Sequence, residues 1–237
     1  MIEVTQIRKS YGKKKVLSDI TFQVNPGECV AIAGKNGCGK TTLMQIMAGI
    51  LKPDGGGLCY FGKKAAYRSS AFRRFCGYVP QENPLMEELT VQENLKLWGG
   101  SHNASTKELT AQFQLEDLLQ TEVSKLSGGM KRRLSIACAL VENPPFLLMD
   151  EPTTALDLYY KESIHQWMKT YQQKNGIILM TTHDESEIRN ADRCLFMDEG
   201  KVQELDAEDI FKSLQACQND NQVQILRKQR KTREDSL

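Results

Sequence analysis

The stretch Gly34-Lys35-Asn36-Gly37-Cys38-Gly39-Lys40-Thr41 fits the pattern G-x-x-x-x-G-K-[ST], which is typical of a phosphate-binding loop. It comes directly after the apolar run Cys29 to Ala33 and directly before a segment with a helical pattern, which is the context that such a loop requires. Glycines let the backbone curl so that successive N–H groups face one anion, and the dipole of the following helix adds positive charge there. A plain glycine turn between strand and helix is the alternative, and the match on both flanks counts against it.

Two side chains at the end of this loop can bind the phosphates of a nucleotide and the Mg²⁺ that accompanies them. We expect Lys40 to bridge the β- and γ-phosphates and the Thr41 hydroxyl to ligate Mg²⁺. The loop alone does not choose ATP over GTP. The nucleotide-binding residues predicted in and beside it are Gly34, Asn36, Gly37, Cys38, Gly39, Lys40, Thr41 and Thr42.

Strands and helices alternate outward from this loop. Apolar alternation and β-branched residues predict the strands, which are separated by turn residues such as Asn25-Pro26-Gly27. The run 52–57 is expected to be a loop because of its proline and glycines. Strands that alternate with helices indicate an α/β fold with a mostly parallel sheet. The expected strands are 2–8, 16–24, 28–33, 146–150, 177–181 and 194–197, and the expected helices are 40–50, 159–171 and 184–190.

The middle and the end of the chain depart from this alternation. Between Gln81 and Met130 there is no convincing strand, and helical patterns occur near 90–98, 105–113 and 128–141. We therefore expect an all-helical lobe, about 82–140, inserted into the α/β core. From about Cys217 the chain is rich in Gln and Asn and then basic, with little to bury. The expected organisation is a single domain over 1–215 and a polar, basic tail over 216–237.

The apolar run Phe146 to Met149 ends in two acids, Asp150 and Glu151. A strand of this parallel sheet would bring both carboxylates to the edge where the phosphate-binding loop lies. There Asp150 can hold Mg²⁺, and Glu151 can accept a proton from the attacking water. Taken alone, two acids after a strand more often belong to a helix cap or a solvated turn. Because the chain also carries the phosphate-binding loop at Gly34, the catalytic interpretation is favoured here.

A second candidate anion site lies at Ser127-Gly128-Gly129, which opens the helix predicted from Lys131 to Val141. A serine followed by two glycines leaves N–H groups exposed at a helix N-terminus. Taken alone, this triplet is more often a plain helix start.

Six motifs in this order resemble the motif set of the ATP-binding cassette (ABC) ATPases, over about residues 2–215. The fold implied is a P-loop NTPase core with an N-terminal antiparallel β subdomain and an inserted all-helical subdomain. The motifs are Gly34 to Thr41 (the Walker A loop), Gln81 in Tyr78-Val79-Pro80-Gln81, Leu126 to Met130, Asp150-Glu151, Ala155-Leu156-Asp157 and His183.

The resemblance implies that two such domains pair head to tail, with ATP held between the Gly34 loop of one and the Ser127 segment of the other. Charge-assisted hydrogen bonds from Ser127, Gly128 and Gly129 would cover the open face of the γ-phosphate, each worth about 1.5 to 3 kcal/mol. Closure of the pair is therefore expected to depend on ATP.

The resemblance also implies roles for residues that carry little signal alone. Gln81 looks like the residue that touches Mg²⁺ and the attacking water, His183 like the switch histidine that contacts the γ-phosphate and orients Glu151, and Tyr11 like the aromatic that stacks on adenine. Asp157 resembles the residue that communicates across the dimer. The alternatives are a solvated glutamine, a structural histidine, a packed turn tyrosine and a helix-capping aspartate. The implied catalytic set is Glu151, His183, Gln81 and Lys40, and the implied metal set is Thr41, Gln81 and Asp150.

Two positions depart from the family's common form. Met130 stands where the signature most often has Gln, which removes an amide side chain and leaves the Ser127 and glycine donors, so we expect activity to survive. Cys38 is not required by the mechanism, and a thiol at a helix N-terminus is expected to be unusually reactive.

The composition excludes several other classes of protein. The 237 residues include 31 Lys+Arg and 30 Asp+Glu, so a net charge of +1 does not favour nucleic-acid binding through bulk charge. No run approaches the roughly 18 apolar residues of a membrane span. Seven cysteines without a Cys-x-x-Cys pair argue against a zinc site and against a disulfide framework. The N-terminus has no signal-peptide pattern. Together these features indicate a cytoplasmic protein.

One cassette without membrane spans implies a second ATPase subunit, a homodimer in the simplest case, and a separate integral membrane permease. The chain would then lie on the inner face of the cell membrane. The run Leu126 to Leu140 resembles exporter-type ATPases, so export is favoured over import. The alternative is a soluble ABC ATPase acting on ribosomes or nucleic acid, which normally carries a second cassette, a long coiled coil or zinc modules that are not found in these 237 residues.

Overall fold

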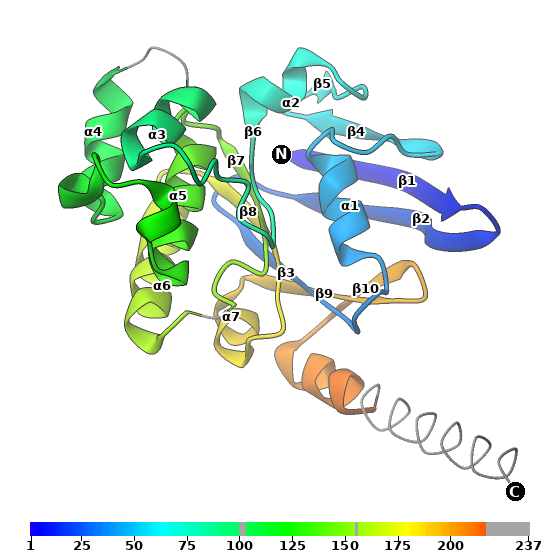
Figure 1. Cartoon of the computed structure of the whole chain (residues 1–237). Coiled ribbons are helices and arrows are strands. Elements are labelled where there is room, and N and C mark those ends of the chain that lie inside the picture. The colour runs from blue at the N-terminus through cyan, green and yellow to red at the C-terminus, as the bar shows by residue number, and fades with distance from the viewer. Residues whose placement is uncertain (100–102, 155, 217–237) are drawn as a thin grey trace, which may run out of the picture.

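The computed structural model describes residues 1–99, 103–154 and 156–216, which contain two sheets packed against helices (Figure 1). The larger sheet is mostly parallel, because β3 pairs in parallel with both β8 and β9, and β7 pairs in parallel with β6 and β8. Its order is β10 (Lys201–Leu205), β9 (Arg193–Asp198), β3 (Cys29–Ala33), β8 (Ile177–Thr181), β7 (Phe146–Asp150), β6 (Cys76–Val79). The smaller, antiparallel sheet has the order β2 (Lys14–Val24), β1 (Ile2–Tyr11), β4 (Gly55–Tyr60), β5 (Lys63–Lys64).

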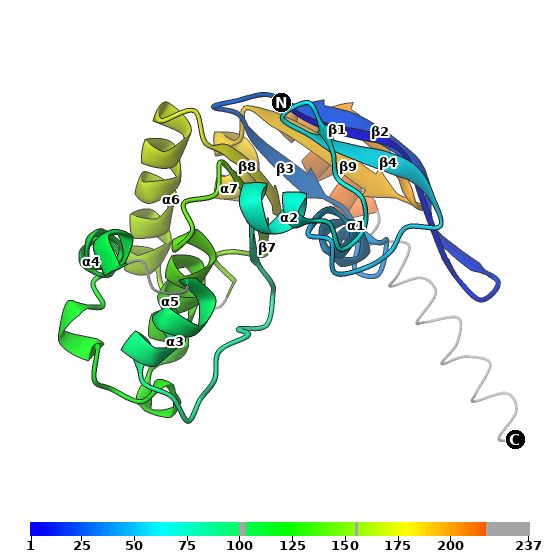
Figure 2. The same ribbon diagram turned by 90° about the horizontal axis from the view of Figure 1, so that it is seen from above.

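The helices fall into two groups on opposite sides of the larger sheet (Figure 2). α1 lies between the two sheets, whereas α3, α4, α5 and α6 form the group on the other side. Residues 207–216 are also helical. The helices are α1 (Lys40–Met47), α2 (Ser70–Phe75), α3 (Val91–Gly99), α4 (Asn103–Gln112), α5 (Gly128–Leu140), α6 (Leu158–Gln173) and α7 (Glu185–Asn190), with 3₁₀ turns at Glu116–Leu118 and Val123–Lys125.

Alternate residues of the central strands bury into two separate cores. Ala31 and Ala33 of β3 join one core with α5 and α6, while Val30 and Ile32 join the other with α1 and the small sheet. Because both faces are covered, β3, β7 and β8 are buried along their whole length. This explains why these strands read in the sequence as short continuous apolar runs.

These elements confirm the predicted α/β class, with an N-terminal antiparallel sheet. The described residues of 91–140 form helices and no strand. The proposed domain limits, 82–140 for the lobe and 1–215 for the whole, stay predictions. The tail predicted over 216–237 lies, apart from its first residue, outside the described residues. Among the described residues, no helix combines the length and the apolar composition that crossing a membrane requires.

The loop predicted over 52–57 is wrong at its end, because Gly55 to Gly57 begin β4. Gly57 pairs with Thr5 and Gly55 with Arg8 of β1, and β1 is irregular between these two pairs. A Cβ on Gly56 would lie 2.3 Å from the Gln6 carbonyl oxygen, so the close approach of β1 requires glycine there. Composition favoured a loop, and pairing with a distant strand outweighs that local preference.

Candidate active site

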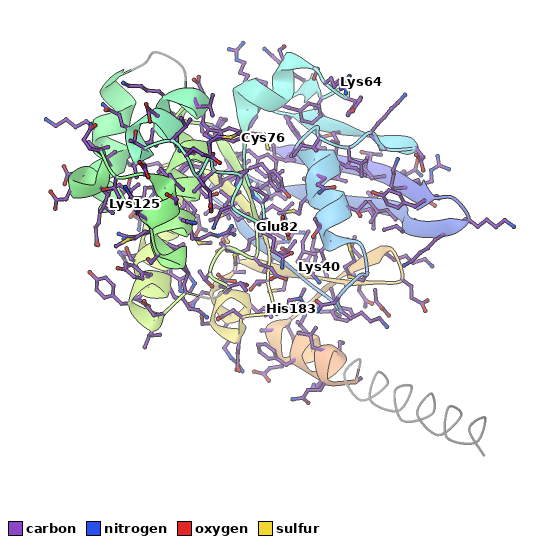
Figure 3. All side chains as sticks on the ribbon, viewed as in Figure 1. Lys40, Lys64, Cys76, Glu82, Lys125 and His183 are labelled. Atoms are coloured by element: carbon purple, nitrogen blue, oxygen red, sulfur yellow. The ribbon has the colours of Figure 1, made fainter. Side chains whose placement is uncertain are left out.

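A cavity of about 700 Å³ opens at the carboxyl ends of β3, β7 and β8, where the sequence placed the phosphate-binding loop and the acids. It collects side chains from the N-terminal sheet, the loop before α1 together with the first turn of α1, the segment after β6 and the segments after β7 and β8. Lys40 and His183, which come from two of these segments, are labelled in Figure 3. The lining residues are Tyr11, Lys14, Val16, Asn36, Gly37, Gly39, Lys40, Thr41, Thr42, Gln81, Glu151, Thr154 and His183.

The loop from Gly34 to Gly39 depends on glycine at two positions. Gly34 has φ +155°, and a Cβ there would lie 2.2 Å from the Met197 carbonyl oxygen. Gly39 has φ +115°, in the left-handed region, and its Cβ would lie 2.9 Å from a Leu17 methyl group. The backbone can therefore turn into α1 only with glycine at both positions.

The N-terminus of α1 lacks both a side-chain cap and an acidic residue in its own first turn. Lys40 is 7% exposed, and its Nζ donates to the carbonyl oxygens of Gly34 at 2.7 Å and Lys35 at 3.2 Å. Backbone N–H groups, a helix dipole and an ammonium group thus meet at one end of the cavity, an arrangement suited to phosphate.

Asp150 ends β7 and is 1% exposed. Its Oδ1 accepts a hydrogen bond from the Thr181 hydroxyl, whereas its Oδ2 is buried and has no hydrogen-bond partner. A buried carboxylate oxygen without a partner is costly unless a cation or water satisfies it. Carboxylate and hydroxyl oxygens are ligands that Mg²⁺ accepts, so Asp150 together with Thr41 fits a Mg²⁺ site.

Glu151 connects three segments of the cavity wall. Its Oε2 accepts from Gln81 Nε2 at 3.1 Å and from Thr154 Oγ1 at 3.2 Å, and its Oε1 lies 3.6 Å from His183 Nε2. The residue has φ +50°, which non-glycine residues rarely adopt, and its N–H donates to both oxygens of Thr181. The structure therefore places Glu151 in a hydrogen bond with Gln81 and brings the His183 ring to within 3.6 Å of the same carboxylate.

The imidazole of His183 is held in its neutral form. Burial and the charge of Lys40 lower the pKa of His183, and Glu151 opposes them less strongly. A neutral ring at pH 7 has one nitrogen that donates and one that accepts a hydrogen bond.

Six predicted site residues do not line the cavity. Gly34 and Cys38 belong to the loop before α1 and Asp150 ends β7, so these three lie in segments that form its wall, whereas Ser127, Gly128 and Gly129 lie at the start of α5. Ser127 caps α5, since its Oγ accepts from the Met130 N–H at 3.3 Å, and Ser127 and Gly128 are exposed. Lys125, two positions before Ser127, is labelled on the helical part of the molecule in Figure 3, away from Lys40 and His183. Within one copy of the chain, the second candidate anion site and the cavity are thus separate.

Two further predicted residues, Tyr11 and Asp157, have simple local geometry. Tyr11 ends β1 with half of its surface exposed, and it lines the cavity. Asp157 is exposed and caps α6 by accepting from the Tyr160 N–H at 3.1 Å, which agrees with the helix-cap alternative. Ala155, in the same motif, lies outside the described residues.

The expected high reactivity of Cys38 is contradicted. Burial raises the pKa of the Cys38 thiol, and the charge and backbone N–H of Lys40 only partly offset that effect. The dipole that suggested a reactive thiol is present, but desolvation of the thiolate outweighs it.

Sequence reasoning missed Lys14, Val16 and Thr154 in the cavity wall, and Arg132 behind it. Lys14 and Val16 belong to a strand whose contact with the loop depends on how the two sheets pack. Arg132 had a local signal, because Arg132 and Arg133 lie on a helix whose other buried positions are, apart from Ser135, apolar.

Comparisons with known proteins agree with this geometry. Residues 17–154 match the protein family described as ABC transporter. A "Nod factor export ATP-binding protein I" of Paraburkholderia xenovorans (strain LB400) is 39% identical over 209 residues, which is 84% of this chain and 68% of that protein. The protein of the same name from Rhizobium etli is 35% identical over 227 residues, 92% of this chain and 72% of that protein.

A solved dimer of an ATP-binding cassette in a post-hydrolysis state, bound to ADP and Pi, superposes on this structure with a TM-score of 0.80. It is 28% identical, and the match covers 87% of this chain and 99% of that one. The chain therefore belongs to the ABC transporter family, as an ATP-binding ATPase subunit.

Proposed function

We propose that two copies of this chain close head to tail around two ATP molecules and thereby drive export through a separate membrane subunit. The observation that carries this proposal is the separation, within one copy, of the phosphate-binding cavity from the exposed Ser127 and Gly128 at the start of α5. A second copy can supply the missing donors to the open face of the γ-phosphate. The solved cassette dimer described above supports this arrangement.

The roles proposed for the cavity residues follow from their positions. Tyr11 stacks on adenine, and Lys40 exchanges its hydrogen bonds with the Gly34 and Lys35 carbonyls for phosphate oxygens. Thr41, Asp150 and Gln81 hold Mg²⁺. When bound, Mg²⁺ would neutralise part of the charge on the phosphate oxygens.

Glu151 is the proposed acceptor of the proton from the attacking water. Gln81 Nε2 and His183 Nε2 lie 3.1 Å and 3.6 Å from its two oxygens, so they orient the carboxylate. General-base catalysis of this kind contributes about 10²- to 10⁴-fold to a rate. A neutral His183 can also donate a hydrogen bond to the γ-phosphate without holding a second charge beside Lys40.

The membrane subunit is proposed to bind near Leu97 and Trp98 at the end of α3. These side chains are 57% and 45% exposed, and Met86, in the preceding loop, is 47% exposed. Large apolar groups exposed on one segment are typical of an interaction surface. The names of the two relatives reported above, which contain the word export, support that direction of transport.

The test is affinity purification of the tagged Glu151→Gln chain from detergent-solubilised membranes with ATP and Mg²⁺. A multi-spanning membrane protein at one or two chains per two ATPases supports the proposal. Leu97→Glu should lose this partner, whereas Ile50→Glu should keep it, since Ile50 is also 57% exposed but lies beyond α1. Recovery with ribosomes or nucleic acid instead would favour the soluble alternative.

A further inference from the structure

Arg132, on the second turn of α5, is a buried charged residue to which the proposed function assigns no role. It is 4% exposed, and none of the ion pairs found among the described residues includes it. Burial lowers its pKa to about 10, although Asp150, Glu187 and Glu151 lie near enough to oppose that effect. A buried guanidinium that makes no direct ion pair needs other acceptors for its five N–H groups.

Backbone carbonyls of two catalytic segments supply those acceptors. Nε donates to Pro152 O at 2.8 Å, and Nη2 donates to Asp150 O at 2.8 Å and to Glu151 O at 2.9 Å. Nη1 donates to the carbonyl oxygens of Pro80 and Gln81. One side chain thus joins the loop after β6 to the loop after β7.

These hydrogen bonds hold the backbone of Gln81 and Glu151. Glu151 is the proposed proton acceptor, and Gln81 is proposed to orient its carboxylate. Glu151 has φ +50°, and Arg132 binds the carbonyls immediately before and after its Cα as well as that of Pro152. Gln81 reaches Glu151 through a single hydrogen bond of 3.1 Å, which depends on the separation of the two loops. Arg132 does not line the cavity, so it influences the reaction through these carbonyls.

We propose that Arg132 is a positioning residue that ties Gln81 and Glu151 to the helix beginning at Ser127. A movement of α5, when Ser127 binds the nucleotide of the partner copy, is then transmitted to the carboxylate that activates water. This inference rests on the roles proposed above for Gln81 and Glu151.

The test compares Arg132→Lys with Arg133→Lys, measuring ATP hydrolysis at a protein concentration that saturates the activity. Arg133 is the matched control because it is also 4% exposed on α5, but it donates to Phe113 and Gln114 and stacks on Tyr160. A lysine at 132 keeps the charge and cannot reach both loops. We expect kcat to fall about 10- to 100-fold with the KM and Kd for ATP nearly unchanged, because a displacement of about 1 Å has effects of that size.

Arg133→Lys should keep kcat within about twofold even if it lowers the melting temperature. If Arg132→Lys does not fold, Arg132→Gln, which retains an N–H donor without the charge, is measured in the same way. An unchanged kcat in the folded variant, or equal losses of kcat and ATP affinity in both variants, would overturn the inference. Absence of hydrolysis by the unaltered chain would instead refute the function proposed above.

Discussion

Glu151 is the residue on which the contacts of the cavity converge. Its two carboxylate oxygens face Gln81, Thr154 and His183, and its backbone is held by Thr181 and Arg132. The left-handed backbone at this position costs roughly 1 to 3 kcal/mol, which surrounding hydrogen bonds must offset. Such strain is common where a side chain must be aimed at a reacting atom.

Replacing Glu151 with Gln keeps the size of the side chain and removes the proton acceptor. We expect ATP binding to persist and the rate of phosphate release to fall by about 10²-fold or more. Glu162→Gln, at an exposed position of α6, makes the same chemical change outside the cavity and should leave the rate unaltered. Near-normal phosphate release from Glu151→Gln would exclude the general-base role.

Asp184 begins α7 directly after His183 and contributes stability that depends on pH. Its Oδ1 accepts from the N–H groups of Ser186 and Glu187, and its Oδ2 lies 2.7 Å from Lys161 Nζ. Partial burial acts to raise the pKa of Asp184, but the hydrogen bonds from Lys161 and Ser186 outweigh it and hold the pKa well below its usual value. Since the folded pKa lies below the unfolded value, this stability is present at neutral pH and is lost as the pH falls below about 4.

Asp184→Asn keeps the helix cap and removes the charge. We expect the free energy of unfolding at pH 7 to fall by about 1 kcal/mol, and the difference from the unaltered chain to shrink as the pH falls below about 4. Urea denaturation at several pH values measures this. A difference that stays constant down to pH 2 would contradict the role of the charge.

Among the elements, β4 is the one whose formation most clearly depends on a distant partner. Three successive glycines open it, and Gly56 has φ +87° with the β1 backbone directly against it. Gly57, by contrast, has free space around its Cα.

Gly56→Ala is therefore expected to lower the free energy of unfolding by about 2 kcal/mol or more, because its methyl group would overlap the Gln6 carbonyl. Gly57→Ala should change it by less than about 1 kcal/mol. Thermal or urea denaturation of both variants makes the comparison. Equal effects of the two substitutions would mean that close approach to β1 does not determine the glycine at 56.

The molecule as a whole presents the two helix ends that are proposed to bind phosphate on different parts of its surface. α1 points its N-terminus into the cavity, and α5 begins at the exposed Ser127. In the proposed head-to-tail arrangement, a complete phosphate site would form only between two copies, so dimer formation is expected to depend on nucleotide.

Ser127→Asp is expected to weaken the dimer without destabilising the fold. Asp caps a helix N-terminus as well as Ser does, but its negative charge repels the phosphate of the partner's nucleotide. In the Glu151→Gln background with ATP, we expect this variant to stay monomeric in light scattering, while the parent forms dimers. Ser124→Asp adds the same charge at an exposed position three residues earlier and should not prevent dimers. Dimers of Ser127→Asp at the parent's affinity would refute the head-to-tail arrangement.

The loop at Gly34, the strands β3, β7 and β8 and the helices beside them were predictable from the sequence. Each is encoded locally, by glycines where the backbone must turn and by apolar runs where a strand is buried on both faces. The two acids at the end of β7 could be assigned to the region of the cavity because the carboxyl ends of parallel strands meet at one edge of the sheet. Glu151 lines the cavity, and Asp150 lies next to it in sequence.

Only the tertiary structure decided that β4 is a strand, that the Cys38 thiol is desolvated, and that Arg132 binds two loops at once. These properties arise from contacts between residues far apart in the chain, such as Gln81 with Glu151 and Gly56 with Gln6. They depend on strand order and on how the sheets and α5 pack together. Local residue preferences are too weak to specify such contacts, because pairing and burial energies exceed them.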